Sequence, residues 1–202
     1  MKIGLIGGLL LVPAGIYGQT KMESPNIVII EADDLGFGDL SCYGATAIQT
    51  SGMDRLANEG LRFTDAYCTA ATSTPSRYSL LTGMYPWSNP QAKILPGNAA
   101  LIIDTHRITL PKMMRSAGYV TGAVGKWHLG LGDGAVDWNQ PIYPGAKEVG
   151  YDYSFIQAAT NDRVPCIFLE NGKGVGLSAD DPLYVNYRMN FPGEPTGKDN
   201  PE

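Results

Sequence analysis

The sequence predicts an α/β fold in which a mostly parallel central sheet is flanked by helices. Short runs of branched apolar residues alternate with segments that carry helix start and stop signals, a pattern typical of a parallel sheet covered on both faces. The composition agrees, because 44% of the 202 residues are hydrophobic and 17% are charged, as in a globular domain. The 25 glycines and 14 prolines indicate many turns and loops between the elements.

The expected strands are short. The first, Asn26 to Ala32 (NIVIIEA), is almost continuously apolar, as a strand buried on both faces would be. Further strands are expected at Leu61 to Tyr67, Tyr119 to Val124, Asp152 to Ile156 and Cys166 to Leu169. Because ligands gather beyond the carboxyl ends of strands in open α/β sheets, polar residues that follow these strands are the first candidates for a functional site.

Three helices are expected from their end signals. Ser51 to Gly60 begins with a capping residue and ends on glycine. Pro75 to Leu81 opens with proline and is followed by Gly83. Thr109 to Gly118 has threonine at its cap, proline in its first turn and glycine past its end.

The N-terminus predicts an exported bacterial protein, periplasmic or secreted. Lys2 precedes an apolar run from Ile3 to Ile16, and Gly18 offers a small residue for cleavage, so residues 1–18 are expected to be a signal peptide. The run is shorter than the ~20 apolar residues that cross a bilayer, and no stable membrane span is expected. An uncleaved anchor or a buried strand are the alternatives.

Net charge and cysteine content limit the ligands and the cysteine chemistry to be expected. The net charge of −5 and the absence of a long basic stretch exclude nucleic acid as the expected ligand. Cys42, Cys68 and Cys166 are odd in number and fit no metal-binding spacing. They allow either one disulfide with a free thiol or three unpaired cysteines.

Two polar clusters follow expected strands. Asp33 and Asp34 are adjacent carboxylates, which repel each other unless a hard cation such as Ca²⁺ lies between them; the alternative is a pair of solvated turn residues. Lys126 and His128 are two apart, so that in extended chain both project to one side and can grip an anion; the alternative is a surface lysine and a structural histidine. His106 is expected to be structural.

The segment TSTPSRYSLLTG places Ser73 at the start of the second expected helix. A serine hydroxyl is a weak nucleophile and needs a base, a metal or a chemical change to act. No histidine lies nearby in sequence, and no G-x-S-x-G elbow is present. Taken alone, this serine carries no assignment.

The three segments taken together are far more specific than any one of them alone. NIVIIEADDLGFGDLSCYG, TSTPSRYSLLTG and TLPKMMRSAGYVTGAVGKWHLG occur in this order along the chain. With them the sequence closely resembles the sulfatases of the alkaline phosphatase superfamily, the arylsulfatase-like type I group, from Asn26 to about Tyr187. The resemblance implies an alkaline phosphatase-like fold and sulfate ester hydrolysis.

The resemblance also implies a modified nucleophile. In that family a Cys or Ser is oxidised after synthesis to formylglycine, an aldehyde that hydrates to a gem-diol. Ser73 stands at that position, so the chain resembles the serine-type members, which a radical maturing enzyme of anaerobic bacteria converts. One diol oxygen takes the sulfuryl group, and the other loses its proton, re-forms the aldehyde and expels sulfate.

Roles for the neighbouring residues follow from the same resemblance. Asp33 and Asp34, with the oxygen of residue 73, would ligate Ca²⁺, and Mg²⁺ is the alternative. Arg77 would hold the diol, and Lys126 and His128 would contact the sulfate and the diol.

Five further residues take lesser roles. Pro75 and Ser76 would serve motif geometry and recognition by the maturing enzyme, whereas Thr74 is interpreted as a spacer. In the stretch NDR, Asp162 and Arg163 would face the substrate, with Arg163 on a sugar carboxylate or hydroxyl; a loop salt bridge is the alternative.

The chain departs from the family in length. The family also needs a second Asp-Asn pair, a further lysine and a histidine, and Asp199-Asn200 is interpreted as a chance match. Residues 19–202 are therefore expected to form the N-terminal part of a sulfatase catalytic domain that is incomplete in this chain and inactive alone. The expected substrate is a sulfated carbohydrate or an aryl sulfate. A phosphate or phosphonate ester hydrolase and a non-catalytic binder of sulfated glycan are the alternatives.

Overall fold

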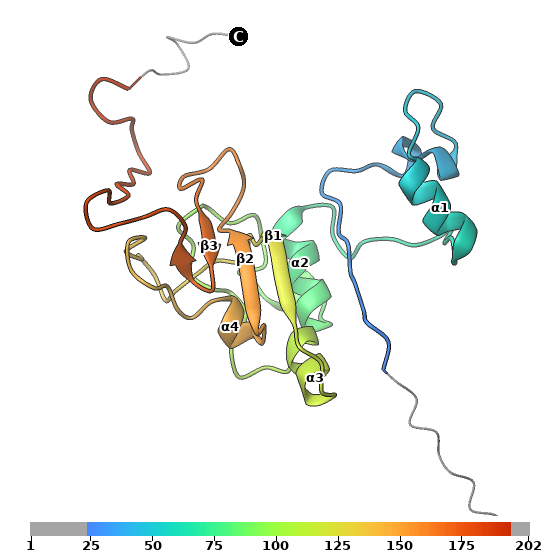
Figure 1. Ribbon diagram of the computed structural model, residues 1–202, viewed down its shortest axis with the longest axis horizontal. Helices are drawn as coiled ribbons and strands as arrows, with labels where there is room; N and C mark the ends of the chain where they lie inside the picture. Colours follow the sequence, from blue (N-terminus) through green and yellow to red (C-terminus); the bar gives the residue numbers. More distant parts are fainter. Residues whose placement is uncertain (1–23, 195–202) are drawn as a thin grey trace, which may run out of the picture. The chain divides into compact units, whose positions relative to one another are not determined.

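The computed structural model describes residues 24–194, coloured along the chain in Figure 1. It divides into two compact units, Met1–Gln49 and Thr50–Glu202, and each is described by itself. The expected signal peptide at residues 1–18 and the Asp199-Asn200 dipeptide lie outside the described residues. No helix within residues 24–194 is long and apolar enough to cross a membrane.

The first unit contains two short 3-10 helices and no described strand. The helices are η1 (Phe37–Asp39) and η2 (Ser41–Tyr43). The prediction of a buried strand at Asn26 to Ala32 is wrong for this unit, because the segment is irregular and its apolar side chains are exposed, Val28 by 80%. A strand is stabilised by a partner on at least one edge, and no pairing is formed by this run within the described residues.

The second unit is built on a four-stranded sheet of order β1-β2-β3-β4. Its strands are β1 (Gly122–Lys126), β2 (Tyr153–Gln157), β3 (Phe168–Glu170) and β4 (Lys173–Gly174). β1 and β2 run parallel, whereas β2 with β3 and β3 with β4 are antiparallel. The α/β fold is confirmed, but the described sheet is mixed rather than mostly parallel, since a hairpin follows β2.

The strand predictions were partly right. β2 lies where it was expected, and β1 and β3 lie about two residues beyond their predicted bounds. β1 extends to Lys126 because that residue pairs with Gln157 at the end of β2, which brings the Lys126 and His128 segment to the edge of the sheet. The predicted strand at Leu61 to Tyr67 is wrong: the segment is irregular and Tyr67 is 87% exposed.

All three predicted helices are confirmed. They are α1 (Ser51–Glu59), α2 (Ser73–Thr82) and α3 (Leu110–Ser116). The structure contains two further short helices that were not predicted, η3 (Pro86–Ser88) and α4 (Ala146–Val149). Thr109 caps α3 as expected, because its hydroxyl accepts a hydrogen bond from the backbone N–H of Lys112.

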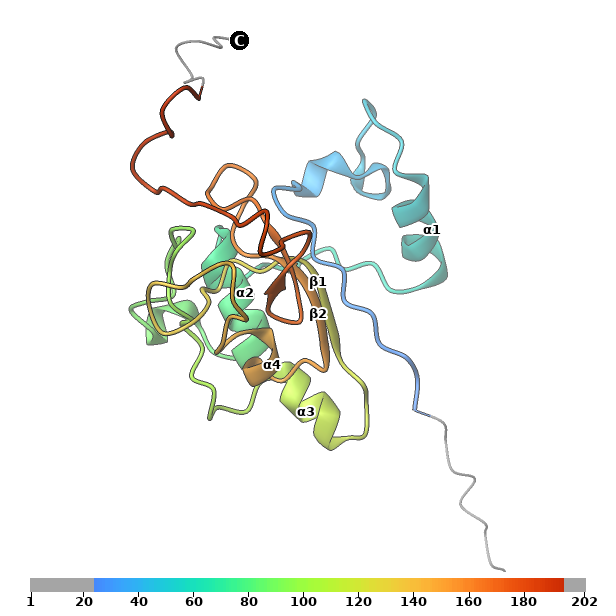
Figure 2. The same cartoon turned by 60° about the vertical axis from the view of Figure 1, so that its left-hand side comes forward.

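Helices cover one face of the described sheet. In Figure 2, α2 and α4 lie on the same side of β1 and β2. The alternation in β2 agrees, since Ser154 and Ile156 are buried whereas Tyr153 is 41% exposed. On β1, Val124 points away from the core and is 79% exposed. The expected cover on both faces is therefore wrong for residues 50–194.

The core of the second unit lies between the covered face of the sheet and α2. It is formed mainly by apolar side chains of α2, of the loop before α3, of the segment after β1, and of α4, β2 and β3. Its most deeply buried large members are Ile103, Trp127, Leu129, Val149, Ile156 and Leu169. The three cysteines are all free.

Asp152 ties the end of α3 to the starts of β1 and β2. Its carboxylate accepts hydrogen bonds from the backbone N–H of Thr121 (2.9 Å) and from the Thr121 hydroxyl (3.1 Å), and pairs with Arg115 at 3.1 Å. The backbone bond from Thr121, then its hydroxyl and Arg115, hold the pKa of Asp152 below its usual value of 3.8. A carboxyl whose pKa is lowered by folding stabilises the folded state above its unfolded pKa.

Substituting Asp152 by asparagine is therefore expected to lower Tm at pH 7. The difference from the parent protein should shrink as the pH falls through the lowered pKa of the folded carboxyl, because protonation removes the same charge. Thermal unfolding of both proteins between pH 7 and pH 3 measures this. The exposed Asp133, changed to asparagine, is the matched control, and a Tm difference independent of pH would contradict the prediction.

Candidate active site

The N-terminus of α2 presents Ser73. Thr72 stands before the helix in extended conformation, and Gly83 ends the helix with φ 68°. Pro75 fits the first turn because the backbone N–H that it lacks would have no partner within the helix. Ser73 is half-buried, whereas Thr74 and Pro75 are buried.

Two side chains contact the Ser73 hydroxyl. Arg77, one turn further along α2, donates from Nε to Ser73 Oγ at 3.0 Å. His128 Nδ1 lies 3.2 Å from the same oxygen. Arg77 also donates from Nη1 to the carbonyl of Lys126 at 2.8 Å, and so ties α2 to the end of β1. The predicted contact between Arg77 and residue 73 is present in the unmodified chain.

His128 is held on its backbone and on its ring. Its backbone has φ 52° and its side chain is 2% exposed. Its N–H donates to the Ala158 carbonyl at 3.1 Å, and its carbonyl accepts from the Thr74 hydroxyl at 2.7 Å. Nε2 lies 3.0 Å from the Leu95 carbonyl, opposite the nitrogen that faces Ser73.

The pKa of His128 is lowered from its usual value. Burial is the largest cause; the hydrogen bond to the Leu95 carbonyl opposes it, and the positive charges of Lys126, Arg163 and Arg77 add to it. The imidazole is therefore neutral near pH 7 and has one nitrogen that can accept a proton. A neutral ring beside a hydroxyl, among cations, suits a proton acceptor better than a sulfate-binding charge.

Asp162 and Arg163 lie in the same neighbourhood. Arg163 donates from Nη1 to the Leu95 carbonyl, and the same nitrogen is 3.1 Å from His128 Nε2. The hydrogen bond from the Thr160 hydroxyl is the main cause that lowers the pKa of Asp162, and the charges of Arg163 and Lys126 contribute. The structure thus gathers all six predicted site residues of the second unit: Ser73, Arg77, Lys126, His128, Asp162 and Arg163.

The sequence did not reveal two groups that hold His128 in place. Thr74 was interpreted as a spacer, but it is fully buried and its hydroxyl holds the carbonyl of His128. The carbonyl of Leu95 contacts the far side of the His128 ring. These contacts join residues 54 and 33 positions apart in the chain, so no local sequence pattern reveals them.

Asp33 and Asp34 belong to the first unit. Asp34 has a left-handed backbone with φ 58°, which directs the chain sharply after the apolar run. Their carboxylate oxygens are the donors that Ca²⁺ and Mg²⁺ prefer. Within residues 24–194 no group of three or more His, Cys, Asp or Glu side chains that could hold a metal ion is formed. The two aspartates fit part of a hard-cation site and do not complete one.

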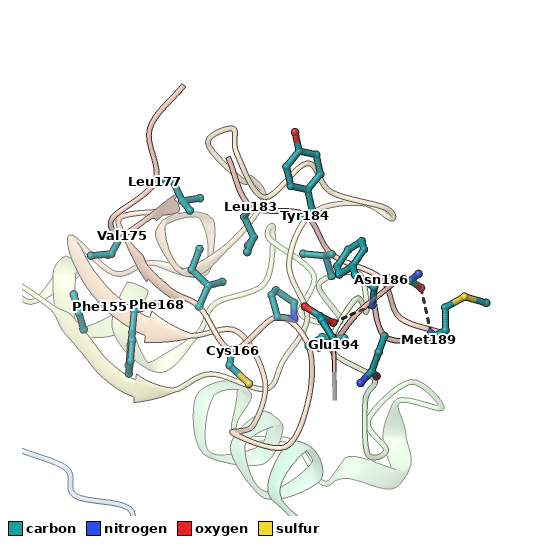
Figure 3. Close-up of a pocket in the computed structure, with 16 residues that line it drawn as sticks. Phe155, Cys166, Phe168, Val175, Leu177, Leu183, Tyr184, Asn186, Met189 and Glu194 are labelled. Carbon is teal, nitrogen blue, oxygen red and sulfur yellow. Dashed lines mark hydrogen bonds between the residues drawn. The ribbon is translucent and has the colours of Figure 1, made fainter. Parts of the chain in front are cut away.

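A separate cavity of about 500 Å³ lies beside β2 and β3. Figure 3 shows Phe155 and Phe168 stacked at its wall, with ring centroids 5.3 Å apart. Its lining from the described chain is mostly apolar, and Glu194 is its charged member. An acidic, apolar hollow does not suit a sulfate anion, whereas the cationic surroundings of Ser73 do.

Comparison with known proteins agrees with this geometry. The family model described as Sulfatase matches residues 25–165. An N-acetylgalactosamine-6-O-sulfatase of Bacteroides thetaiotaomicron is 58% identical over 186 residues, which cover 92% of this chain and 36% of that protein. Human arylsulfatase H is 43% identical over 120 residues, which cover 56% of this chain and 21% of the human protein. The chain thus spans about a third or less of these relatives' length.

Solved structures give the same result. One, from work on the metabolism of multiple glycosaminoglycans by Bacteroides thetaiotaomicron, has a TM-score of 0.79 at 58% identity and is matched over 84% of this chain and 35% of its own. A second, solved with a neocarrahexaose, has a TM-score of 0.57 at 28% identity over 71% of this chain and 35% of its own. With the family model matching residues 25–165, the chain belongs to the sulfatase family.

Proposed function

We propose that this sequence, within a complete sulfatase catalytic domain, hydrolyses sulfate esters with residue 73 as its nucleophile. The observation that carries the proposal is the Ser73 hydroxyl held between Arg77 Nε and His128 Nδ1, at 3.0 and 3.2 Å, among cationic side chains. The substrate class proposed is a sulfated glycan, and the similarity to an N-acetylgalactosamine-6-O-sulfatase favours a 6-O-sulfated amino sugar. Aryl sulfates serve as small test substrates.

The chain's own residues have distinct tasks in this reaction. Arg77 and Lys126 supply positive charge where the sulfate group and the attacking oxygen carry negative charge, which is the main need of such a transfer. The neutral ring of His128 takes a proton from the hydroxyl of residue 73 through Nδ1. Asp162 and Arg163 are proposed to lie toward the leaving group of the substrate.

A modification and a metal complete the proposal. Conversion of Ser73 to formylglycine, by a radical maturing enzyme, would give two hydroxyls on one carbon, so that one carries the sulfuryl group and the other restores the aldehyde as sulfate leaves. Asp33, Asp34 and the oxygen of residue 73 would hold Ca²⁺, or Mg²⁺ in its place. When bound, the cation lowers the pKa of the hydroxyl and polarises the sulfate oxygens. Export to the periplasm or beyond is proposed from the N-terminal sequence.

Mass spectrometry of the tryptic peptide Phe63 to Arg77 tests the nucleophile. The protein is made in an anaerobic host with its own maturing enzyme, and the expected result is the loss of two hydrogens at Ser73 together with reactivity toward aldehyde reagents. In parallel, release of sulfate and of phosphate from matched aryl esters separates a sulfatase from a phosphate ester hydrolase. Unmodified Ser73 with retained glycan binding would favour the non-catalytic alternative.

Removal of the cation is expected to abolish turnover. Chelation should stop sulfate release, and added Ca²⁺ should restore it. Replacing Asp34 by asparagine removes one proposed ligand charge, and kcat/KM is expected to fall by at least about 10²-fold. The exposed Asp180, changed to asparagine, is the control, and full activity of the Asp34 variant after chelation would contradict the metal proposal.

A further inference from the structure

The Leu95 carbonyl receives two donors at one point. His128 Nε2 lies 3.0 Å from this oxygen, and Arg163 donates to it from Nη1. A carbonyl oxygen has two lone pairs and accepts both bonds. Arg163 Nη1 also lies 3.1 Å from His128 Nε2: with a proton on Nε2 the two nitrogens are donors that share one acceptor, and with a bare Nε2 Arg163 donates to the ring.

Two loops meet here with their backbones in close contact: one carries Leu95 and Gly97, and the other carries Arg163 and Val164. A Cβ on Gly97 would stand 2.1 Å from the carbonyl oxygen of Val164, so only glycine allows the loops to come this close. The loop with Leu95 continues into Ala99, whose carbonyl accepts a hydrogen bond from Leu131 N–H at 2.9 Å. The Leu95 carbonyl is thus held in place by two neighbours of its loop: the Arg163 loop, and the segment after His128 that bonds to Ala99.

The contacts on the two sides of the His128 ring favour one position for its proton. Arg77 Nε–H already donates to Ser73 Oγ, so the Ser73 O–H is left to donate to an acceptor. A bare Nδ1 on His128, 3.2 Å away, is that acceptor, and the ring proton then lies on Nε2, pointing at Leu95. In the opposite tautomer Ser73 Oγ would receive two donors, which its two lone pairs allow, and a bare Nε2 would accept from Arg163 Nη1. Its lone pair would, however, also face the Leu95 carbonyl oxygen at 3.0 Å, where two acceptors repel each other.

We infer that the Leu95 carbonyl, held in place by Arg163, fixes His128 in the tautomer whose bare Nδ1 faces residue 73. Arg163 is then a positioning residue of the nucleophile. This role is additional to the contact with substrate proposed for its remaining donors. The inference deepens the proposed function, and only its kinetic part rests on that function.

Nitrogen-15 NMR of labelled histidine tests the inference directly. In the parent protein, with His128 assigned by its loss in His128→Gln, the proton is expected on Nε2 and Nδ1 is expected bare. In Arg163→Met, which keeps the side-chain length but removes the donors, the other tautomer should become populated. The exposed Arg188, changed to methionine, is the control and should leave the signals unchanged.

Kinetics on a small aryl sulfate, which has no sugar for Arg163 to contact, give the second readout. Arg163→Met is expected to lower kcat by about 10- to 100-fold with KM unchanged, and Arg163→Lys, which keeps a donor for Leu95, should recover part of the loss. A proton on Nδ1 in the parent protein would overturn the inference. So would an Arg163→Met variant with normal kcat on the aryl sulfate and a raised KM on glycan alone. If a complete catalytic domain carrying this sequence released no sulfate, the proposed function would fail, and the tautomer would still decide the inference.

Discussion

In a complete catalytic domain, replacing Ser73 by alanine is expected to abolish sulfate ester hydrolysis, with kcat falling by at least about 10³-fold. The hydroxyl is the atom that Arg77 and His128 both contact, at 3.0 and 3.2 Å, and alanine offers neither an oxygen to attack sulfur nor a carbon that can be oxidised to the aldehyde. Sulfate release from an aryl sulfate and from a 6-O-sulfated amino sugar measures the effect.

The fold should tolerate this change. Ser73 is half-buried on the first turn of α2, and alanine is a good helix former, so Tm is expected to stay close to that of the parent protein. Ser116, an exposed serine on α3 whose hydroxyl bonds only to a backbone carbonyl of its own helix, gives the matched alanine control. Retained turnover in a folded Ser73→Ala protein would remove residue 73 from the reaction and with it the proposed mechanism.

The largest effect on stability is expected at Gly130. Its φ is +78°, and a Cβ there would stand 1.8 Å from the carbonyl oxygen of Ala100 and 2.4 Å from its carbon. Two strong backbone bonds on either side, Ile102 N–H to Leu129 and Leu131 N–H to Ala99, prevent the segments from moving apart. Alanine at position 130 is therefore expected to lower the free energy of unfolding by at least about 3 kcal/mol, measured by urea denaturation.

Two other glycines separate the causes of this loss. Gly125 has φ +101° but no atom within 4 Å of its Cβ position, so Gly125→Ala reports the backbone strain alone, about 1–2 kcal/mol. Gly134 has neither a positive φ nor a neighbour within 4 Å, and its alanine variant should be close to neutral. Equal losses at Gly130 and Gly125 would show that the contact with Ala100 is relieved at little cost.

The sequence predicted the elements whose ends carry their own signals. The caps and glycines of α1, α2 and α3 are local, and local chemistry decides where a helix begins and ends. The order of the Asp-Asp, Ser73 and Lys126 segments predicted the family, which the match over residues 25–165 confirms. Within the second unit, the predicted residues on α2 and after β1 lie together because β1 continues to Lys126.

Strand predictions failed where pairing decides the outcome. Asn26 to Ala32 and Leu61 to Tyr67 have the apolar character of strands, yet a strand forms only where a neighbour supplies hydrogen bonds, and sequence alone does not name that neighbour. The hairpin of β3 and β4 made the sheet mixed for the same reason. The contacts of Thr74 and Leu95 with His128 are between distant segments, and the residue types involved are common in any core.

The contacts of α2 also bear on timing during synthesis. Thr74 and Arg77 bond to carbonyls of His128 and Lys126, which the ribosome adds 54 and 49 residues later. A nascent chain that has just exposed the TSTPSR segment therefore lacks the groups that bury Thr74 and engage Arg77. If Ser73 is modified as proposed, an enzyme that reads its neighbours in extended form would have its opportunity in that interval, before these contacts form.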